Sequence, residues 1–360
     1  MKILIVNTNP FAKDGITNVI MNYYHEMDKT KLHIDAVSIK KPLDEFQKAF
    51  HSNGGNIYTI NREIKHPFQY INELKKIIKT NKYDIVHAHG NSSTLVLEML
   101  AAKLAGCKIR IAHCHNTKCN SLFIHKVFNP LFKMLYTHGF ACGEAAGKWL
   151  FGKDDFTVLN NAISCEKFAY QKTYREQIRR EYHIDNEEIV IGHVGYFQPV
   201  KNQTFIIDII AELDPKYKAL LIGEGPLKQN IQEKVGALGL SDRVIFVGNT
   251  NKVSEHLSAC DLVVMPSLFE GLPLSLMEQQ ASGLQCIVSD TITKEVDKTG
   301  NFAFVSLDLG AKAWAEKINH LDLSIDRNIV SQKAMVDITA SGYSIENESL
   351  KLEAFYTNML

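Results

Sequence analysis

The amino-acid sequence predicts an α/β protein with two doubly wound parallel sheets in tandem. Short runs rich in Ile and Val alternate with longer segments of helical spacing, which is typical of βα units. A polar, charged segment at 164–186 interrupts this alternation once, and the alternation then resumes. A chain of 360 residues is also longer than one hydrophobic core usually grows. We therefore expect two domains.

The first half opens with a strand at 2–7, a loop to Gly15 and a helix at about 16–27. Each later strand precedes a helical or looped connection, as parallel strands require. These strands are expected at 34–39, 56–60, 85–89, 109–113, 139–142 and 156–159. A Rossmann-like domain is predicted over 1–165, followed by a linker and a helix at 164–186.

A second βα series predicts another Rossmann-like domain over 186–340. Its strands are expected at 189–194, 217–222, 244–247, 262–265, 286–288 and 302–305. The tail over 344–360 is predicted to be a helix that docks back on the N-terminal domain, because it carries spaced apolar residues. These residues are Leu350, Leu352, Phe355, Tyr356 and Leu360.

Composition and charge exclude several classes of protein. Hydrophobic residues make up 45% and charged residues 22%, which is typical of a globular protein. Lys and Arg balance Asp and Glu at 40 each, so no overall field favours nucleic acid. The seven cysteines are odd in number, which favours free thiols in a reducing compartment. With no signal-peptide core and no long apolar run, we expect a cytoplasmic protein that contacts a membrane at most peripherally.

The most informative stretch follows the strand at 262–265. A loop containing Glu270 and Gly271 leads to a helix that is expected to begin at Pro273 and to carry Glu278. Free N–H groups and the positive end of the helix dipole would face a diphosphate, which Gly271 lets the backbone approach. The two carboxylates would accept hydrogen bonds from hydroxyls on either side of that diphosphate. A single glutamate is more often a plain surface residue, but the pair in this context points to a nucleotide sugar.

This stretch resembles the retaining glycosyltransferase family 4, whose signature is two glutamates separated by seven residues. Flanking matches support the resemblance: Pro266, Ser267, the run 281–283, the run 195–201, the run 223–226 and Asp261. The family has the GT-B fold, in which two Rossmann-like domains face each other across a cleft. The chain is most similar to members that build capsule and exopolysaccharide.

The resemblance implies a hexosyltransferase that moves a sugar from a nucleotide-sugar donor, a UDP-sugar, with retention. It implies a saccharide or polyprenyl-linked saccharide as the acceptor and neither metal nor other cofactor, while the balanced charge predicts no nucleic-acid partner. The family roles place Glu278 at the ribose hydroxyls and Glu270 near the transferred sugar. The loop provides backbone N–H groups to the sugar and the phosphates, and it consists of Gly271, Leu272, Pro273 and Leu274.

The run from Gly195 to Lys201 resembles the family's phosphate-binding strand and loop. Lys201 matches the phosphate-binding lysine, whereas Tyr196 stands where an arginine is usual. Losing such a donor can cost about 3 kcal/mol of transition-state stabilisation. In the first half, Gly15 lies in the counterpart of a glycine-rich loop in which one glycine has become Asp14. The resemblance further places His115 and Asn116 beside the donor sugar or the acceptor.

Several alternatives remain open. A nucleotide-sugar epimerase can share the architecture, and a weakly active partner subunit would fit the missing arginine at Tyr196. A nicotinamide dehydrogenase is disfavoured because no Gly-x-Gly-x-x-Gly run follows the first strand. The pairs His87/His89 and His113/His115 suggest zinc, but their spacing fits no standard ligand signature, and hydrogen-bonded histidines are the favoured interpretation.

The segment 121–153 combines apolar residues with lysines. Packing of this stripe against a sheet is favoured over contact with an anionic membrane. The apolar residues are Phe123, Val127, Phe128, Leu131, Phe132, Leu135, Trp149 and Leu150, and the lysines are Lys126, Lys133, Lys148 and Lys153.

Overall fold

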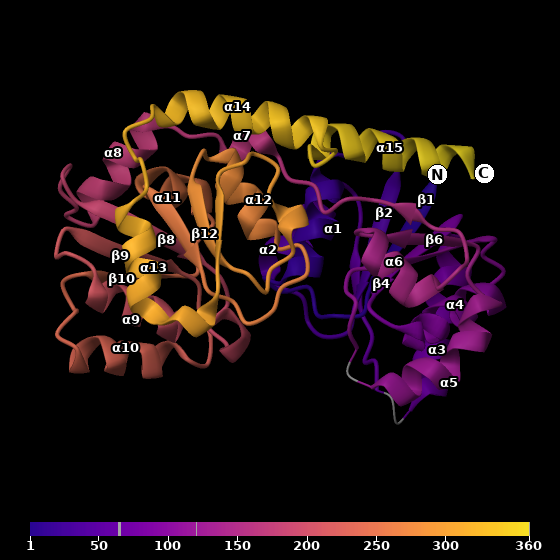
Figure 1. Ribbon diagram of the computed structural model, residues 1–360. Coiled ribbons are helices and arrows are strands. Elements are labelled where there is room, and N and C mark those ends of the chain that lie inside the picture. The colour runs from indigo at the N-terminus through magenta and orange to yellow at the C-terminus, as the bar shows by residue number, and fades with distance from the viewer. Residues whose placement is uncertain (64–65, 120, 360) are drawn as a thin grey trace. The chain divides into compact units, whose positions relative to one another are not determined.

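The computed structural model describes residues 1–63, 66–119 and 121–359. Contacts divide the chain into two compact units, one formed by 1–162 with 345–360 and the other by 163–344. Each unit is built around one parallel sheet with helices on both faces (Figure 1). The predicted fold class, with two doubly wound α/β domains, is confirmed. Leu360 lies outside the described residues.

The first unit has a seven-stranded sheet in the order β3-β2-β1-β4-β5-β6-β7, and all of its pairings are parallel. The strands are β1 (Lys2–Asn7), β2 (His33–Ser38), β3 (Ile57–Thr59), β4 (Ile85–Gly90), β5 (Ile109–Cys114), β6 (His138–Ala141) and β7 (Thr157–Val158). The helices are α1 (Gly15–Glu26), α2 (Asp44–His51), α3 (Pro67–Asn81), η1 (Ser93–Leu95), α4 (Val96–Leu104), α5 (Leu122–Lys133), α6 (Glu144–Phe151) and α15 (Ile345–Asn358).

Alternation along these strands divides the side chains between the two faces of the sheet. Leu4, Val6 and Val86 point into a core shared with helices α3 to α6. On the opposite face, His87 contacts Tyr356 of α15, and α15 in turn packs against α1. The tail is therefore the docking helix that its apolar spacing predicted, although Leu350 is exposed.

The second unit has a six-stranded sheet in the order β10-β9-β8-β11-β12-β13, and its pairings are also parallel. The strands are β8 (Ile189–Val194), β9 (Tyr217–Ile222), β10 (Val244–Gly248), β11 (Leu262–Met265), β12 (Gln285–Ser289) and β13 (Phe302–Val305). Helices α9 (Gln203–Glu212), α10 (Lys228–Ala237) and α13 (Gly310–Asn319) cover one face. The other core includes residues of α7 (Cys165–Phe168), α11 (Val253–Ala259), α12 (Leu274–Ala281) and α14 (Arg327–Ala340). Short 3₁₀ turns complete the unit: η2 (Pro199–Lys201), η3 (Lys294–Val296) and η4 (Leu307–Leu309).

The segment expected to link the domains instead packs within the second unit, as α7 and α8 (Lys172–Glu181). The reason is a partly buried ion-pair network, in which Arg175 and Arg179 each donate to Asp261 at 2.7 Å. Asp261 also accepts the backbone N–H of Val190 at the start of the sheet. Its place in the sequence motif is therefore explained by the support it gives to β8 and β11.

Candidate functional site

The strand order reverses between β1 and β4 in the first sheet and between β8 and β11 in the second. In open parallel sheets, ligands bind beyond the carboxyl ends of the strands at such reversals. The run from Gly195 to Lys201 follows β8, and the glutamate motif follows β11. The fold thus brings both sequence motifs of the second unit to one edge of its sheet.

Buried polar atoms without a hydrogen-bond partner gather at these edges. Native proteins leave few such atoms, so a group of them calls for a specific explanation such as a ligand. Within the described ranges, those in the second unit are His193 Nε2, Gln203 Oε1, Ser267 Oγ, both amide atoms of Gln279, and Glu270 Oε1, which lies in an ion pair with Lys201 but accepts no hydrogen bond. Each belongs to β8, to the loop after β11, or to a helix that follows one of these loops.

Lys201 and Glu270 form an ion pair at this edge. The distance from Lys201 Nζ to Glu270 Oε1 is 2.7 Å, and the side chains are only 15% and 14% exposed. The loops that carry them are also tied together, because Leu268 donates its N–H to the carbonyl of Val200 at 2.8 Å. Asn202 donates its side-chain amide to the carbonyl of Pro266 at 3.1 Å. A cation and a carboxylate are thereby held side by side, where a sugar diphosphate could meet both.

Glycines allow the neighbouring backbones to come close. A Cβ on Gly223, whose φ is +141°, would lie 2.1 Å from the carbonyl oxygen of Gly195. The loops after β8 and β9 therefore fit together only with glycine at 223. A Cβ on Gly271, by contrast, would meet nothing within 4 Å, so open space surrounds that position. The approach of a ligand to the backbone at Gly271 stays a prediction.

Helix α12 begins one residue later than predicted. Pro273 is its N-cap residue, with φ −71° and ψ 122°, and Leu274 is the first helical residue. Because proline has neither an N–H nor a capping side chain, Pro273 cannot donate to a ligand, contrary to the prediction for the loop. The remaining candidate donors are the N–H groups of Gly271, Leu272 and Leu274.

Glu278 lies one turn into α12. Burial raises the pKa of its carboxyl to about 7, and the nearby Lys167 ammonium opposes the rise. The carboxyl therefore titrates close to neutral pH, and its ionised form is the acceptor that ribose hydroxyls would need. A perturbed carboxyl at a sheet edge marks a candidate functional position.

His193 is a site residue that the sequence analysis did not single out. It is fully buried on β8, and its Nδ1 lies 3.0 Å from the carbonyl of Val264. Nδ1 must therefore be the protonated nitrogen, which leaves Nε2 as an acceptor without a partner. Burial, together with the charge of Lys201, lowers its pKa to about 4, so the ring is neutral. Its position two residues before Gly195 was the only available signal in the sequence.

Tyr196 and Gly195 lie in the loop that follows His193. Tyr196 is 55% exposed, so its ring is not part of the core. Its carbonyl accepts a hydrogen bond of 3.0 Å from Gln203 Nε2, and this contact fixes the loop rather than the phenol. An arginine at 196 could therefore extend from the same backbone without displacing buried atoms.

In the first unit, Gly15 is the first residue of α1, and Asp14 is the N-cap. Asp14 Oδ1 accepts the N–H of Thr17 at 3.0 Å, and burial raises the pKa of this carboxyl. The helix N-terminus is thus satisfied by its own carboxylate, which would repel a phosphate there. A Cβ on Gly15 would meet nothing within 4 Å, so packing does not require this glycine.

His115 and Asn116 directly follow β5. His115 Nε2 lies 2.8 Å from His89 Nδ1, and burial lowers the pKa of His115 to about 4 despite its interaction with Asn161. The side-chain oxygen of Asn116 accepts the N–H of Thr117 at 2.7 Å. The structure therefore places both predicted residues at the carboxyl edge of the first sheet.

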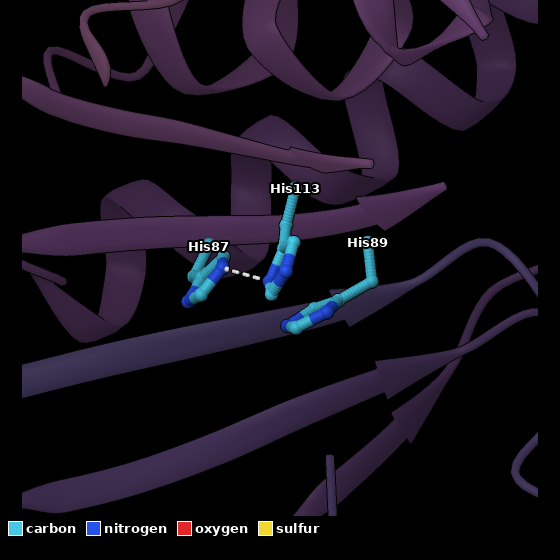
Figure 2. A group of neighbouring side chains, drawn as sticks. All are labelled: His87, His89 and His113. Carbon is cyan, nitrogen blue, oxygen red and sulfur yellow. Dashed lines mark hydrogen bonds between the residues drawn. The ribbon is translucent and has the colours of Figure 1, made fainter. Parts of the chain in front are cut away.

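His87, His89 and His113 form a buried group (Figure 2). His115 contacts two of its members, His89 and His113. One nitrogen from each ring lies within 4.8 Å of the others, so the group could be considered for a metal ion. However, His87 and His89 stack with centroids 4.3 Å apart and planes 22° apart, whereas a metal ligated by both must lie in both ring planes. His87 Nε2 also bonds His113 Nδ1 at 3.2 Å. This geometry favours a hydrogen-bonded stack of neutral imidazoles, and zinc stays a hypothesis.

Two family models match the chain. Residues 174–324 match "Glycosyl transferases group 1", and residues 11–141 match "Glycosyl transferase 4-like". The putative glycosyltransferase EpsF of Bacillus subtilis is 34% identical over 323 residues, which cover 85% of this chain and 84% of that protein. The UDP-Gal:alpha-D-GlcNAc-diphosphoundecaprenol alpha-1,3-galactosyltransferase of Escherichia coli is 30% identical over 314 residues, covering 80% and 78%.

Among solved structures, Anabaena HepE in complex with UDP superposes with a TM-score of 0.80 over 99% of this chain and 100% of that one. At 16% identity this likeness shows the fold alone, and it identifies the fold as GT-B. The relatives found by sequence, at 30% identity or more, show the family as well as the fold. The family predicted from the glutamate motif is thereby confirmed, and this chain belongs to the group 1, family 4-like glycosyltransferases; a relative from Staphylococcus aureus, 25% identical over 315 residues that cover 81% of this chain and 82% of that protein, is named as the capsular polysaccharide biosynthesis glycosyltransferase CapH.

Proposed function

We propose that this glycosyltransferase transfers a hexose from a UDP-sugar, with retention, to a saccharide carried on a polyprenyl lipid, in cell-surface polysaccharide synthesis. The names of its relatives support the choice of donor and acceptor. The Escherichia coli relative is named for UDP-Gal and for an acceptor linked to diphosphoundecaprenol. The fold neighbour HepE was solved with UDP and with UDP-glucose. Peripheral contact with a membrane, where such an acceptor resides, belongs to the same proposal.

The observation that carries the proposal is the buried pair of Lys201 and Glu270 at the edge that also holds Glu278. In the proposed complex, Lys201 turns from Glu270 to the donor diphosphate and offsets the charge that grows as UDP departs. Glu270 is then free to accept a hydrogen bond from a hydroxyl of the transferred sugar. Glu278, on α12, accepts hydrogen bonds from the ribose hydroxyls.

Backbone groups would complete the phosphate site. The N–H groups of Gly271, Leu272 and Leu274 would donate hydrogen bonds to the donor phosphates, aided by the dipole of α12. They would thereby stabilise the negative charge that a divalent metal stabilises in other transferases. With retention, the acceptor hydroxyl attacks the face from which UDP leaves, and a donor phosphate oxygen receives its proton. The protein's contribution is then to position the reactants and neutralise charge.

The residues of the first unit are proposed to serve the transferred sugar or the acceptor. His115 is neutral and sits at the carboxyl edge of its sheet, so it can exchange one hydrogen bond with a hydroxyl group. Asn116 adjoins it, and Gly15 leaves open space at the start of α1. None of these three groups requires a metal or cofactor for that task.

The experiment is an assay of the purified chain with UDP-sugars and a short-chain polyprenyl-diphosphate monosaccharide. Mass spectrometry of the product identifies the transferred sugar, and proton NMR of the new linkage reports its anomeric configuration. Transfer with an α-linkage from an α-linked donor supports the proposal. An inverted product refutes retention, and conversion of the donor without an acceptor would indicate an epimerase instead.

A further inference from the structure

Helix α5 exposes an apolar strip. Five large apolar side chains, four on the helix and one at its C-cap, are between 44% and 77% exposed. They are Leu122, Phe123, Val127, Leu131 and Met134. The sequence favoured packing for this stripe, and that expectation is wrong for Phe123, Val127 and Leu131. Phe132 does enter the core, because it lies on the other side of the helix, and Leu135 enters it just beyond the C-terminal end of the helix.

The strip has a definite geometry on the helix. At 100° per residue, Phe123, Val127 and Met134 fall within about 40° of one another, and Leu131 follows at about 40° beyond Val127. Exposed Lys126 and Lys133 fall together on one flank of the strip. A helix that lies in a membrane interface has this arrangement, with aromatic and aliphatic side chains beside lysines that can extend to the headgroups.

The surrounding charge favours an anionic partner. The stretch 99–143 contains no Asp or Glu, although the chain as a whole has equal numbers of acidic and basic residues. It contains six basic residues, which are Lys103, Lys108, Arg110, Lys118, Lys126 and Lys133. Lys133 is partly neutralised by Asp154, whose Oδ2 lies 2.9 Å from its Nζ. A basic segment with an exposed apolar helix matches the negative surface of a membrane that contains anionic lipid.

We infer that the exposed face of α5 docks the protein on anionic lipid bilayers. Phe123, Val127, Leu131 and Met134 enter the boundary between headgroups and acyl chains, and Lys126 contacts lipid phosphates. No helix in the described part of the chain is long and apolar enough to cross a membrane, so the contact is with one leaflet. The inference extends the membrane contact of the proposed function to a particular surface, but it does not depend on the transfer reaction.

The test is cosedimentation of the full chain with vesicles, without donor or acceptor. One set contains 40% phosphatidylglycerol in phosphatidylcholine, and the other is phosphatidylcholine alone. We expect binding to the anionic set that weakens as salt is raised. The double variant Phe123→Ser/Met134→Ser should lose binding by about tenfold or more, because two large apolar groups no longer enter the interface. Lys126→Gln should lose about fivefold.

The matched control is Ile329→Ser/Val336→Ser, which removes two apolar side chains that are 62% and 67% exposed on α14 of the second unit. This control should bind like the wild type. Equal thermal midpoints for all variants show that exposed positions were changed without unfolding. Equal binding by the wild type and the α5 double variant, or equal binding to both vesicle sets, overturns the inference. A wild-type dimer that the α5 variant makes monomeric in sedimentation also overturns it, because a second copy then covers the strip.

The transfer assay separates this inference from the proposed function. With a water-soluble short-chain acceptor, the α5 variants should keep wild-type activity, since α5 carries none of the proposed site residues. Loss of vesicle binding with normal soluble transfer supports the docking surface. Normal vesicle binding without any transfer leaves docking intact and refutes the enzymatic proposal alone.

Discussion

A double-mutant cycle on Lys201 and Glu270 tests the ion pair at the candidate site. At 2.7 Å and about 15% exposure, neither charge has full access to water. Removing either partner leaves the other poorly solvated, and such breaks cost up to about 3–5 kcal/mol when a pair is fully buried. Because this pair retains some exposure, we expect Lys201→Met and Glu270→Gln each to destabilise the second unit by about 1–3 kcal/mol.

The double variant should recover much of that loss, because no unpaired charge remains. The expected coupling free energy is about 1–3 kcal/mol, measured by urea unfolding followed through the fluorescence of Trp314 in the core of this unit. Activity should behave differently, since either substitution removes a group proposed to act on the donor, and kcat should fall about 100-fold or more in all three variants. Additive stabilities would refute the ion pair, and a double variant with restored kcat would refute its role in transfer.

Four further predictions concern the single residues Glu278, Tyr196 and Tyr356. UDP affinity should weaken as pH falls below about 7, because protonation removes the acceptor at Glu278, and Glu278→Gln should abolish this pH dependence in calorimetry. The folded pKa of Glu278 lies above its ordinary value of 4.5, so its contribution to stability is full below pH 4.5 and is lost as pH rises through 7; Glu278→Gln should therefore unfold at higher urea than the wild type at pH 8. Tyr196→Arg should raise kcat if the site lacks a phosphate donor, and an unchanged kcat would mean that other groups replace it. Tyr356→Phe breaks the 2.6 Å hydrogen bond to His87 and leaves a buried nitrogen unpaired, so thermal unfolding should show a loss of about 1–3 kcal/mol, whereas an unchanged midpoint would contradict that contact.

Much of the fold could be predicted from the sequence, because most strands are short, largely apolar runs bounded by polar loops. The strand at 217–222 matches β9 residue for residue, and the run of Ile and Val at 189–194 matches β8. The boundaries of helices were less certain. The fixed φ of a proline fits both the N-cap and the first helical position, and only the observed ψ of 122° at Pro273 identifies it as the N-cap.

The candidate site was predictable where spacing carries meaning and unpredictable where burial decides. Glu270 and Glu278 were found by their separation around a loop. His193 was not, since only the fold shows that one ring nitrogen is bonded to Val264 and the other is not. The packing predicted for the apolar stripe of helix α5 was wrong for a related reason. An apolar stripe at helical spacing does not reveal whether it faces a sheet or the solvent, and Phe123 faces the solvent.

The most direct test of the central claim, a UDP-sugar site at the carboxyl edge of the second sheet, is calorimetric binding of UDP at pH 8. The wild type is compared with Glu278→Ala and with Glu295→Ala, a surface control in the same unit. We predict that UDP binds the wild type and the control alike, that GDP and ADP bind more weakly, and that Glu278→Ala loses about tenfold or more in affinity. Unchanged UDP affinity in Glu278→Ala, or no UDP binding by the wild type, would contradict the claim.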